Sequence, residues 1–220
     1  MKTEHAHRPR IAIASTGLGH VTRGIETWAW DTAGALRDRG ADVTLFGAFP
    51  GEPPAGAVAV PCLRRDDPAN AAWMERLPGW IWRLGITGAY GLEQFTFWWR
   101  LRPLLQAGNF AILHVQDPRL ALWCRRFRRC GLVRTREILA HGTEESPAFL
   151  RTFPNVQHLA PWHLEATVAA LGLRSPPPGW SAIPNFVDTD LFAPVDRDPN
   201  HMAVREKWRS QLNIPQDALV

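Results

Sequence analysis

The 220-residue sequence has few of the features that mark secreted, zinc-binding or membrane-spanning proteins. It contains three cysteines, an odd number, and neither their spacing nor a nearby histidine pair matches a zinc motif. We therefore expect reduced thiols in a cytoplasmic protein. No stretch approaches about eighteen unbroken apolar residues, and no signal-type apolar segment follows the polar residues 1–10. The sequence thus predicts neither a membrane span nor a secretory leader.

Lysine and tyrosine are also rare, since Lys2, Lys207 and Tyr90 are the only examples, and arginine carries most of the positive charge. The formal net charge is +4. Apart from one group at 125–129, the basic residues are dispersed along the chain. This distribution predicts affinity for small anions or acidic lipid headgroups and no nucleic-acid platform.

Tryptophan, by contrast, occurs 11 times. A packed core and a bias in composition account for most of these residues. Between residues 80 and 102, however, aromatic side chains alternate with arginine, a pattern that suits a membrane interface or a groove for an apolar acceptor. We therefore expect peripheral attachment to an anionic membrane at its cytoplasmic face.

Strand patterns alternate with helix patterns over most of the chain. A short apolar run at 10–15, a glycine-rich loop at 16–24, a helical pattern at 25–36 and a strand at 41–46 form a βαβ opening. Later strand patterns lie at 57–60, 110–115, 137–141, 156–159 and 182–184, and later helix patterns at 93–106, 118–129, 144–151 and 162–171, with 61–92 irregular. The alternation predicts an α/β fold, a doubly wound parallel sheet with helices on both faces.

The composition changes after the proline-rich segment 175–179. Residues 184–199 are rich in proline and aspartate, which is typical of an exposed connector, and 201–212 and 214–220 predict a helix and the start of a strand. We expect three parts. These are a disordered N-terminus at 1–9, one Rossmann-like domain at 10–185, and, at 186–220, a connector with the opening of a second domain that the 220 residues do not include.

The loop 16–24 is the first candidate binding segment. Its glycines let backbone N–H groups approach a ligand, and the following helix N-terminus favours anions, although a simple turn also explains them. The third glycine, Gly24, follows the first by seven positions, and no acidic residue ends the second strand, which excludes an NAD fingerprint. His20 and Glu26 are candidate ligand contacts. The alternatives are a solvated loop histidine and a carboxylate that complements the helix dipole.

The predicted carboxyl ends of two later strands carry further polar residues. Gln116 and Asp117 follow the strand at 110–115, and His141 ends the strand at 137–141. Doubly wound folds bind ligands at this edge of the sheet, so His141 is the strongest candidate to orient a hydroxyl or to contact a transferred group. Glu144, at the start of the next helix, is a candidate contact that helix-terminal charge explains equally well. His114, inside its strand, is interpreted as a core residue.

A metal-binding interpretation of Asp188 and Asp190 is rejected. Their D-x-D form holds a divalent metal in some glycosyltransferases, but such a pair is expected directly after a buried strand. Here the pair lies in the predicted connector.

Four segments resemble, in the same order, the N-terminal half of family 4 glycosyltransferases, which are retaining enzymes of the GT-B fold. They are the opening strand-loop-helix, the turn at 114–118, the strand end at 139–143 and the passage 183–194. The last is the most specific, because it is similar to the I-P-N-G-V-D-x-x-x-F-x-P passage between the two domains of the family.

The resemblance implies a transferase whose N-terminal domain binds a hydroxyl acceptor and whose C-terminal domain binds a nucleotide-sugar, such as a UDP- or GDP-sugar. It implies that His141 contacts the transferred sugar, that Gln116 supplies a second contact, and that Gly24 and Glu26 lie near the diphosphate or acceptor. No metal ion or other cofactor is expected.

The chain would then supply half of a hexosyltransferase cleft and be inactive alone, because transfer needs both substrates held together. The alternative is a non-catalytic Rossmann-like module that binds a sugar or a partner.

Overall fold

The computed structural model describes residues 9–142, 145–185, 199–215 and 217–218. The chain divides into two compact units, Met1–Pro184 and Asn185–Val220, which are described separately. No helix in the described part of the chain combines the length and the apolar character needed to cross a bilayer.

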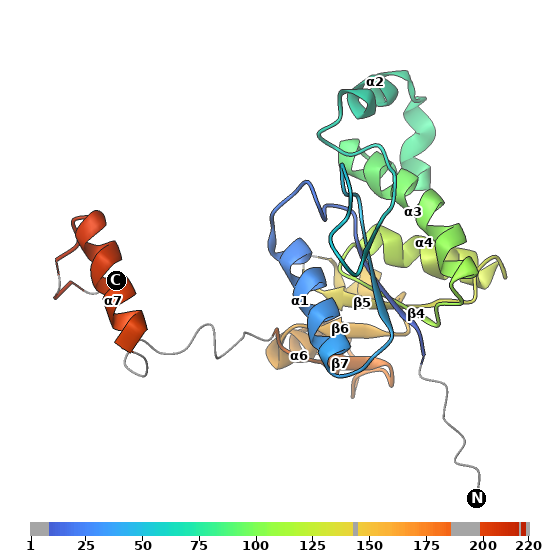
Figure 1. The fold of residues 1–220 in the computed structure, drawn as a ribbon. Helices are drawn as coiled ribbons and strands as arrows, with labels where there is room; N and C mark the ends of the chain where they lie inside the picture. The colour runs from blue at the N-terminus through green and yellow to red at the C-terminus, as the bar shows by residue number, and fades with distance from the viewer. Residues whose placement is uncertain (1–8, 143–144, 186–198, 216, 219–220) are drawn as a thin grey trace, which may run out of the picture. The chain divides into compact units, whose positions relative to one another are not determined.

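One parallel sheet of seven strands organises the first unit (Figure 1). The strand order β3-β2-β1-β4-β5-β6-β7 confirms the predicted doubly wound topology, since the chain builds outward from β1 in one direction and then from β4 in the other. The strands are β1 Ile11–Ser15, β2 Val43–Gly47, β3 Ala57–Ala59, β4 Ile112–Val115, β5 Arg136–His141, β6 Val156–His158 and β7 Trp180–Ala182.

Helices connect the strands, and several begin with proline, whose missing N–H costs nothing at a first helical position. They are α1 Gly24–Asp38, α2 Pro68–Arg76, the 3₁₀ helix η1 Gly79–Leu84, α3 Ala89–Ala107, α4 Pro118–Arg129, α5 Pro147–Leu150 and α6 Pro161–Ala170.

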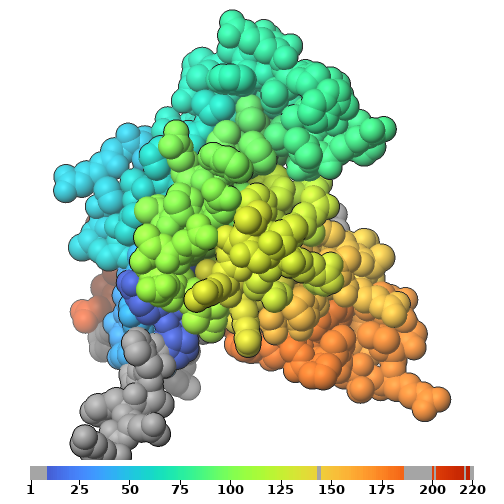
Figure 2. Space-filling model, turned by 90° about the vertical axis from the view of Figure 1, so that its right-hand side faces the viewer, coloured from blue at the N-terminus to red at the C-terminus, as the bar shows by residue number. Residues whose placement is uncertain are grey.

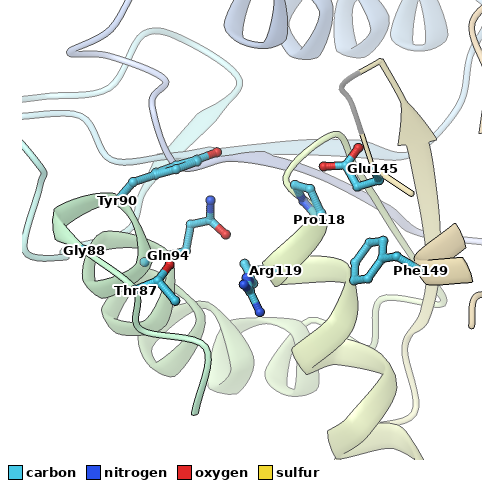
Figure 3. Close-up of a pocket in the computed structure, with 9 residues that line it drawn as sticks. Thr87, Gly88, Tyr90, Gln94, Pro118, Arg119, Glu145 and Phe149 are labelled. Atoms are coloured by element: carbon cyan, nitrogen blue, oxygen red, sulfur yellow. The ribbon is translucent and has the colours of Figure 1, made fainter. Parts of the chain in front are cut away.

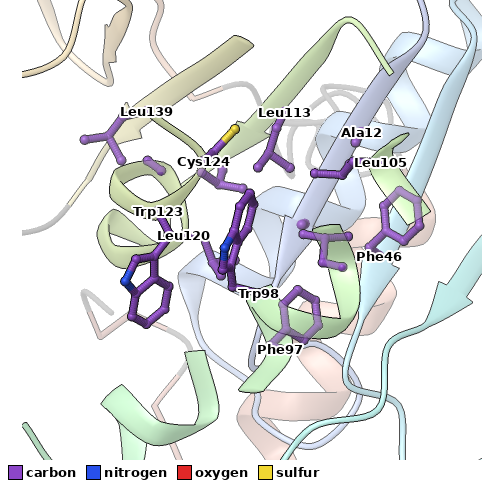
Figure 4. Packing of buried hydrophobic residues seen from close by; sticks show 14 of the residues in the cluster. Ala12, Phe46, Phe97, Trp98, Leu105, Leu113, Leu120, Trp123, Cys124 and Leu139 are labelled. Carbon is purple, nitrogen blue, oxygen red and sulfur yellow. The ribbon is translucent and has the colours of Figure 1, made fainter. Parts of the chain in front are cut away.

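The two faces of the sheet bury separate apolar clusters because alternate residues of each strand point to opposite sides. Ala12 and Ala14 of β1 pack in the larger cluster, with Phe97 and Trp98 of α3 and Leu120 of α4 (Figure 4). On the opposite face, Ile13 of β1 and Leu45 of β2 pack with Trp28 and Ala29 of α1. This two-sided burial explains the near-continuous apolar runs of the central strands.

The structure corrects three sequence-based expectations. The region 61–92 is not irregular, because α2 and η1 lie within it and α3 begins at Ala89. Asp67 caps α2 by accepting a hydrogen bond from the Ala69 backbone N–H at 2.8 Å. The helix expected at 144–151 is reduced to the single turn α5. In the second unit α7 spans Pro199–Gln211, and the described residues after it form no strand.

The expected disorder of the N-terminus and the expected connector fall almost entirely on residues 1–8 and 186–198, outside the described residues. The domain boundaries stay a prediction.

Candidate functional site

The loops that follow β1 and β4, together with the ends of β5 and β6, meet at the carboxyl edge of the sheet, where doubly wound folds bind ligands. Most of the residues singled out from the sequence lie along this edge. They fall into two groups, one around the β1–α1 loop and one at the ends of β5 and β6.

Glu26 lies in the first turn of α1, next to the β1–α1 loop. Its side chain is buried, with Oε1 accepting a hydrogen bond from Arg23 Nη2 at 2.7 Å and lying 3.5 Å from Ser15 Oγ. A Cβ atom on Gly17 would approach Glu26 Oε1 to 2.0 Å, so a side chain at residue 17 would require the Glu26 carboxylate or the loop to move. Gly24, at the start of α1, is exposed and has open space around it.

Asp117 is fully buried and joins three segments. Its carboxylate accepts hydrogen bonds from the Thr16 backbone N–H at 3.0 Å, from Thr16 Oγ1 at 3.3 Å and from the Tyr90 hydroxyl. Burial raises the pKa of this carboxyl group. Gln116 beside it is buried as well. Asp117 therefore fixes the loops around the edge, and its oxygens point to protein groups.

His20 connects the β1–α1 loop to α3. Its Nε2 lies 3.3 Å from Glu93 Oε2, and Glu93 also accepts hydrogen bonds from Arg65 Nε at 2.9 Å and Nη2 at 2.6 Å. Although burial opposes ionisation, the hydrogen bonds from Arg65 lower the pKa of Glu93. The Arg65 guanidinium lies 4.0 Å above the ring of Tyr90.

We call the paired groups around the β1–α1 loop the loop network: His20, Arg23, Glu26, Arg65, Tyr90, Glu93 and Asp117. Sequence reasoning missed Arg65, Tyr90 and Glu93. They lie in or directly after the region expected to be irregular, and no local pattern relates them to His20 or Asp117.

His141 lies at the end of β5 with only 1% of its side chain exposed. Its Nδ1 is 3.3 Å from Glu145 Oε2, and its Nε2 is 3.2 Å from His163 Nε2. His158, on β6, is paired in register with His141, and their ring centroids are 5.3 Å apart. We call His141, His158 and His163 the histidine cluster.

Burial and the neighbouring rings disfavour protonation of His158 and His163. Burial, followed by the charges of His141 and His163, lowers the pKa of His158 to about 4. The pKa of His163 is lowered by burial and by His141. Sequence reasoning missed both residues, although their positions at the end of one predicted strand and the start of the next predicted helix place them on the same edge.

A cavity of about 350 Å³ lies between the N-terminal turns of α3 and α4 and the segment around α5 (Figure 3). Its lining includes Tyr90, Gln94, Arg119, Glu145 and Phe149. Glu145 therefore contacts His141 and also faces the cavity. Glu144, the residue proposed from the sequence, lies outside the described residues, and the acid placed at His141 is its neighbour Glu145.

Comparisons with known proteins agree with this architecture. The model of Glycosyltransferase Family 4 matches residues 22–191. Sucrose-phosphate synthase from Thermosynechococcus elongatus has a similar fold, with a TM-score of 0.62 and 14% identity over 96% of this chain and 54% of that one. A second structure from the same synthase gives a TM-score of 0.53 and 11% identity over 92% of this chain and 99% of that one. No curated protein matches the sequence significantly.

At these identities the structures establish the fold alone. The chain spans about half the length of the longer synthase structure.

Proposed function

Because the chain belongs to glycosyltransferase family 4, we propose that it forms the acceptor-side half of a retaining hexosyltransferase, with His141 in contact with the transferred sugar. A UDP- or GDP-sugar would serve as donor and a hydroxyl group of a glycan, lipid-linked or small-molecule acceptor would receive the sugar. The transfer step would need no metal ion. The 220 residues alone would not catalyse sugar transfer.

The observation that carries this proposal is the position of Glu145 between His141 and the cavity. A carboxylate 3.3 Å from Nδ1 is close enough to orient the imidazole. The His141–Glu145 pair thus supplies a hydrogen-bonding group at one wall of a cavity that can accept a small polar molecule.

The β1–α1 loop contributes the start of α1 to the same edge. The first N–H groups of a helix lack intrahelical partners and favour anionic groups, and Gly24 leaves them accessible. We assign this position to the donor diphosphate or to the acceptor, with Gln116 as a second polar contact. Glu26 and Asp117 act by holding the loops, and His20 by its contact with Glu93.

The experiment supplies a donor-binding half. The DNA that follows the codon for Val220, or an adjacent reading frame, is searched for a second Rossmann-like domain, and the two halves are produced together. UDP- and GDP-sugars are then tested for release of the nucleoside diphosphate with and without hydroxyl acceptors. Acceptor-dependent release by the pair and none by the 220-residue chain supports the proposal.

The internal pairing of the loop network favours one second candidate, a non-catalytic module that binds a sugar or a protein partner. For such a module we expect no donor-binding half to be found and no nucleoside diphosphate to be released. The isolated chain would instead bind a sugar directly. Calorimetry with free sugars separates the two candidates.

Exposed tryptophans of α2, η1 and α3 support a further part of the proposal, contact of a cytoplasmic protein with an anionic membrane. Trp73, Trp80, Trp82 and Trp99 are each more than half exposed. Figure 2 shows the segments that carry the first three of these residues gathered at one end of the first unit. Arg83 and Arg102 lie over Trp82 and Trp99, so aromatic rings and cationic groups occur together.

Flotation with vesicles of anionic lipid tests this contact. The Trp80→Ala/Trp82→Ala variant should lose vesicle binding, whereas Trp162→Ala, which removes an exposed tryptophan from α6, should keep it. Wild-type protein that stays wholly in the soluble fraction would refute the membrane contact.

A further inference from the structure

The histidine cluster is assembled by the fold from three separate elements. His141 and His158 are register partners at the carboxyl ends of the adjacent strands β5 and β6. His163 lies in the first turn of α6, which follows β6 directly. Register partners point to the same face of a sheet, so the two strand residues present their rings side by side, and the helix adds the third.

The spacing of the ring nitrogens suits a common ligand. One nitrogen from each histidine lies within 4.8 Å of the others, and His141 Nε2 and His163 Nε2 are 3.2 Å apart. At a Zn–N distance of about 2.0–2.1 Å, tetrahedral coordination separates ligand nitrogens by about 3.3 Å. The closest pair already has this separation, and modest side-chain rotation would bring the third nitrogen into place.

His158 gives an independent reason to expect a ligand. Its side chain is completely buried, and neither ring nitrogen has a hydrogen-bond partner among the described residues. A buried polar group without a partner is costly and rare in native proteins. The hydrogen bond possible between His141 and His163 satisfies those two rings in part and leaves His158 unexplained.

We propose that His141, His158 and His163 bind one divalent transition-metal ion, with Zn²⁺ as the preferred ion. Three imidazoles form a donor set that suits zinc, copper, iron and nickel, and three protein ligands leave a further position for water. His163 is only half-buried, which gives an ion a path to the cluster. This site is unrelated to the rejected D-x-D pair.

The ion would also act as a positioning group for His141. Coordination through Nε2 would place the remaining proton on Nδ1, where it faces Glu145, a residue that lines the cavity. A metal-bound histidine with a carboxylate partner is a common arrangement, in which the carboxylate fixes the orientation of the ring. The value of this positioning for sugar transfer rests on the proposed function, whereas metal binding does not.

Direct metal titration tests the proposal. Untagged chain is freed of metal with a chelator and titrated with Zn²⁺ by calorimetry and with Co²⁺ by visible absorption. We expect one ion per chain and cobalt bands of a low-coordinate, nitrogen-ligated site. His163→Ala should weaken Zn²⁺ binding by about 100-fold or more, because loss of an outer partner alone costs about 10–100-fold. Glu145→Gln should fall within that smaller range.

Matched variants remove histidines elsewhere. His201→Ala in α7 and His5→Ala/His7→Ala before the described residues should bind one Zn²⁺ as tightly as the wild type. The decisive variant is His163→Ala, because its half-buried side chain can be removed with little risk to folding, and circular dichroism checks this.

Absence of stoichiometric binding would overturn the proposal. So would binding that survives His163→Ala, or binding that is lost with His5 and His7. Because the titration uses neither sugar nor nucleotide, its failure would leave the proposed transferase function intact, and a failed transfer assay would leave a measured metal site intact.

Discussion

The two ends of the same sheet edge use their polar residues in different ways. In the loop network, carboxylates are buried together with cationic or hydroxyl partners. Glu93, for example, contacts both Arg65 and His20. In the histidine cluster, three imidazole rings lie together. The loop network leaves His20 Nδ1 without a hydrogen-bond partner among the described residues, whereas in the histidine cluster both ring nitrogens of His158 have none.

This difference separates groups that stabilise the fold from groups that can bind. A carboxylate surrounded by internal donors is held in place and has little left to offer a ligand. His141, by contrast, has one edge toward Glu145, which lines the cavity, and the other toward His163. We therefore place the chemistry at the ends of β5 and β6 and assign the loop network a supporting role.

The largest expected effect tests that placement. In the reconstituted transferase, His141→Ala should lower the rate of sugar transfer by about 100- to 1000-fold, the range seen when one preorganised polar contact to a transition state is lost. The measurement is acceptor-dependent release of nucleoside diphosphate, with circular dichroism to confirm the fold. A wild-type rate in this variant would remove His141 from the site.

Loss of a paired carboxylate should chiefly affect stability. Glu93→Gln should lower the free energy of unfolding by about 3 kcal/mol, because Arg65 would keep a partly buried charge without its partner. Urea denaturation measures the change.

The stability difference between the wild type and Glu93→Gln should also depend on pH. Since the pKa of Glu93 is lowered in the folded protein, its contribution is complete above the ordinary carboxyl pKa of about 4.3 and is lost as the pH falls through the lowered value. The stability difference between the wild type and Glu93→Gln should therefore shrink only in acid. A difference that grows in acid would contradict the pairing.

Gly17→Ala tests how tightly the loop closes over Glu26. The added Cβ would lie 2.0 Å from Glu26 Oε1, so one of the two must move, and we expect a loss of about 1–3 kcal/mol in unfolding free energy. Gly24→Ala is the matched control, because no atom lies within 4 Å of its added Cβ. Equal stabilities for the two variants would show that the closure over Glu26 is not required.

The smallest expected effect belongs to the histidine cluster without metal. His163→Ala in metal-free protein should change the unfolding free energy by about 1 kcal/mol or less, since one hydrogen bond is lost. Added Zn²⁺ should raise the melting temperature of the wild type and leave the variant unchanged. If His163→Ala in metal-free protein lowered the unfolding free energy as much as Glu93→Gln does, the contrast between the two regions would be refuted.

The fold and the family were predictable because their signals are local. Apolar runs at 10–15 and 110–115 and the helical spacing after Gly24 are properties of short segments, and they correctly predicted the doubly wound sheet. The missed helix α2 has a local signal too, the Asp67–Pro68 start. Its weak apolar periodicity gave no reason to separate it from the surrounding irregular residues.

The site was predictable only in part. The edge position of His141 follows from its place at a strand end, and Gln116 and Asp117 lie on the same edge for the same reason. Their partners could not be inferred, because Thr16 and Asp117 are 101 residues apart and His20 and Glu93 are 73 apart. No sequence pattern distinguishes an aspartate that faces a ligand from one that holds a loop.

The sequence by itself thus determined the class of fold, the family and the edge of the sheet at which the proposed site lies. Tertiary structure decided which polar side chains at that edge are satisfied by one another and which are left with capacity to bind. The physical reason is that periodicity is set by neighbours along the chain, whereas pairing and burial depend on the register of β5 with β6 and on the packing of α3 and α6. The histidine cluster exists only because that register aligns His141 with His158.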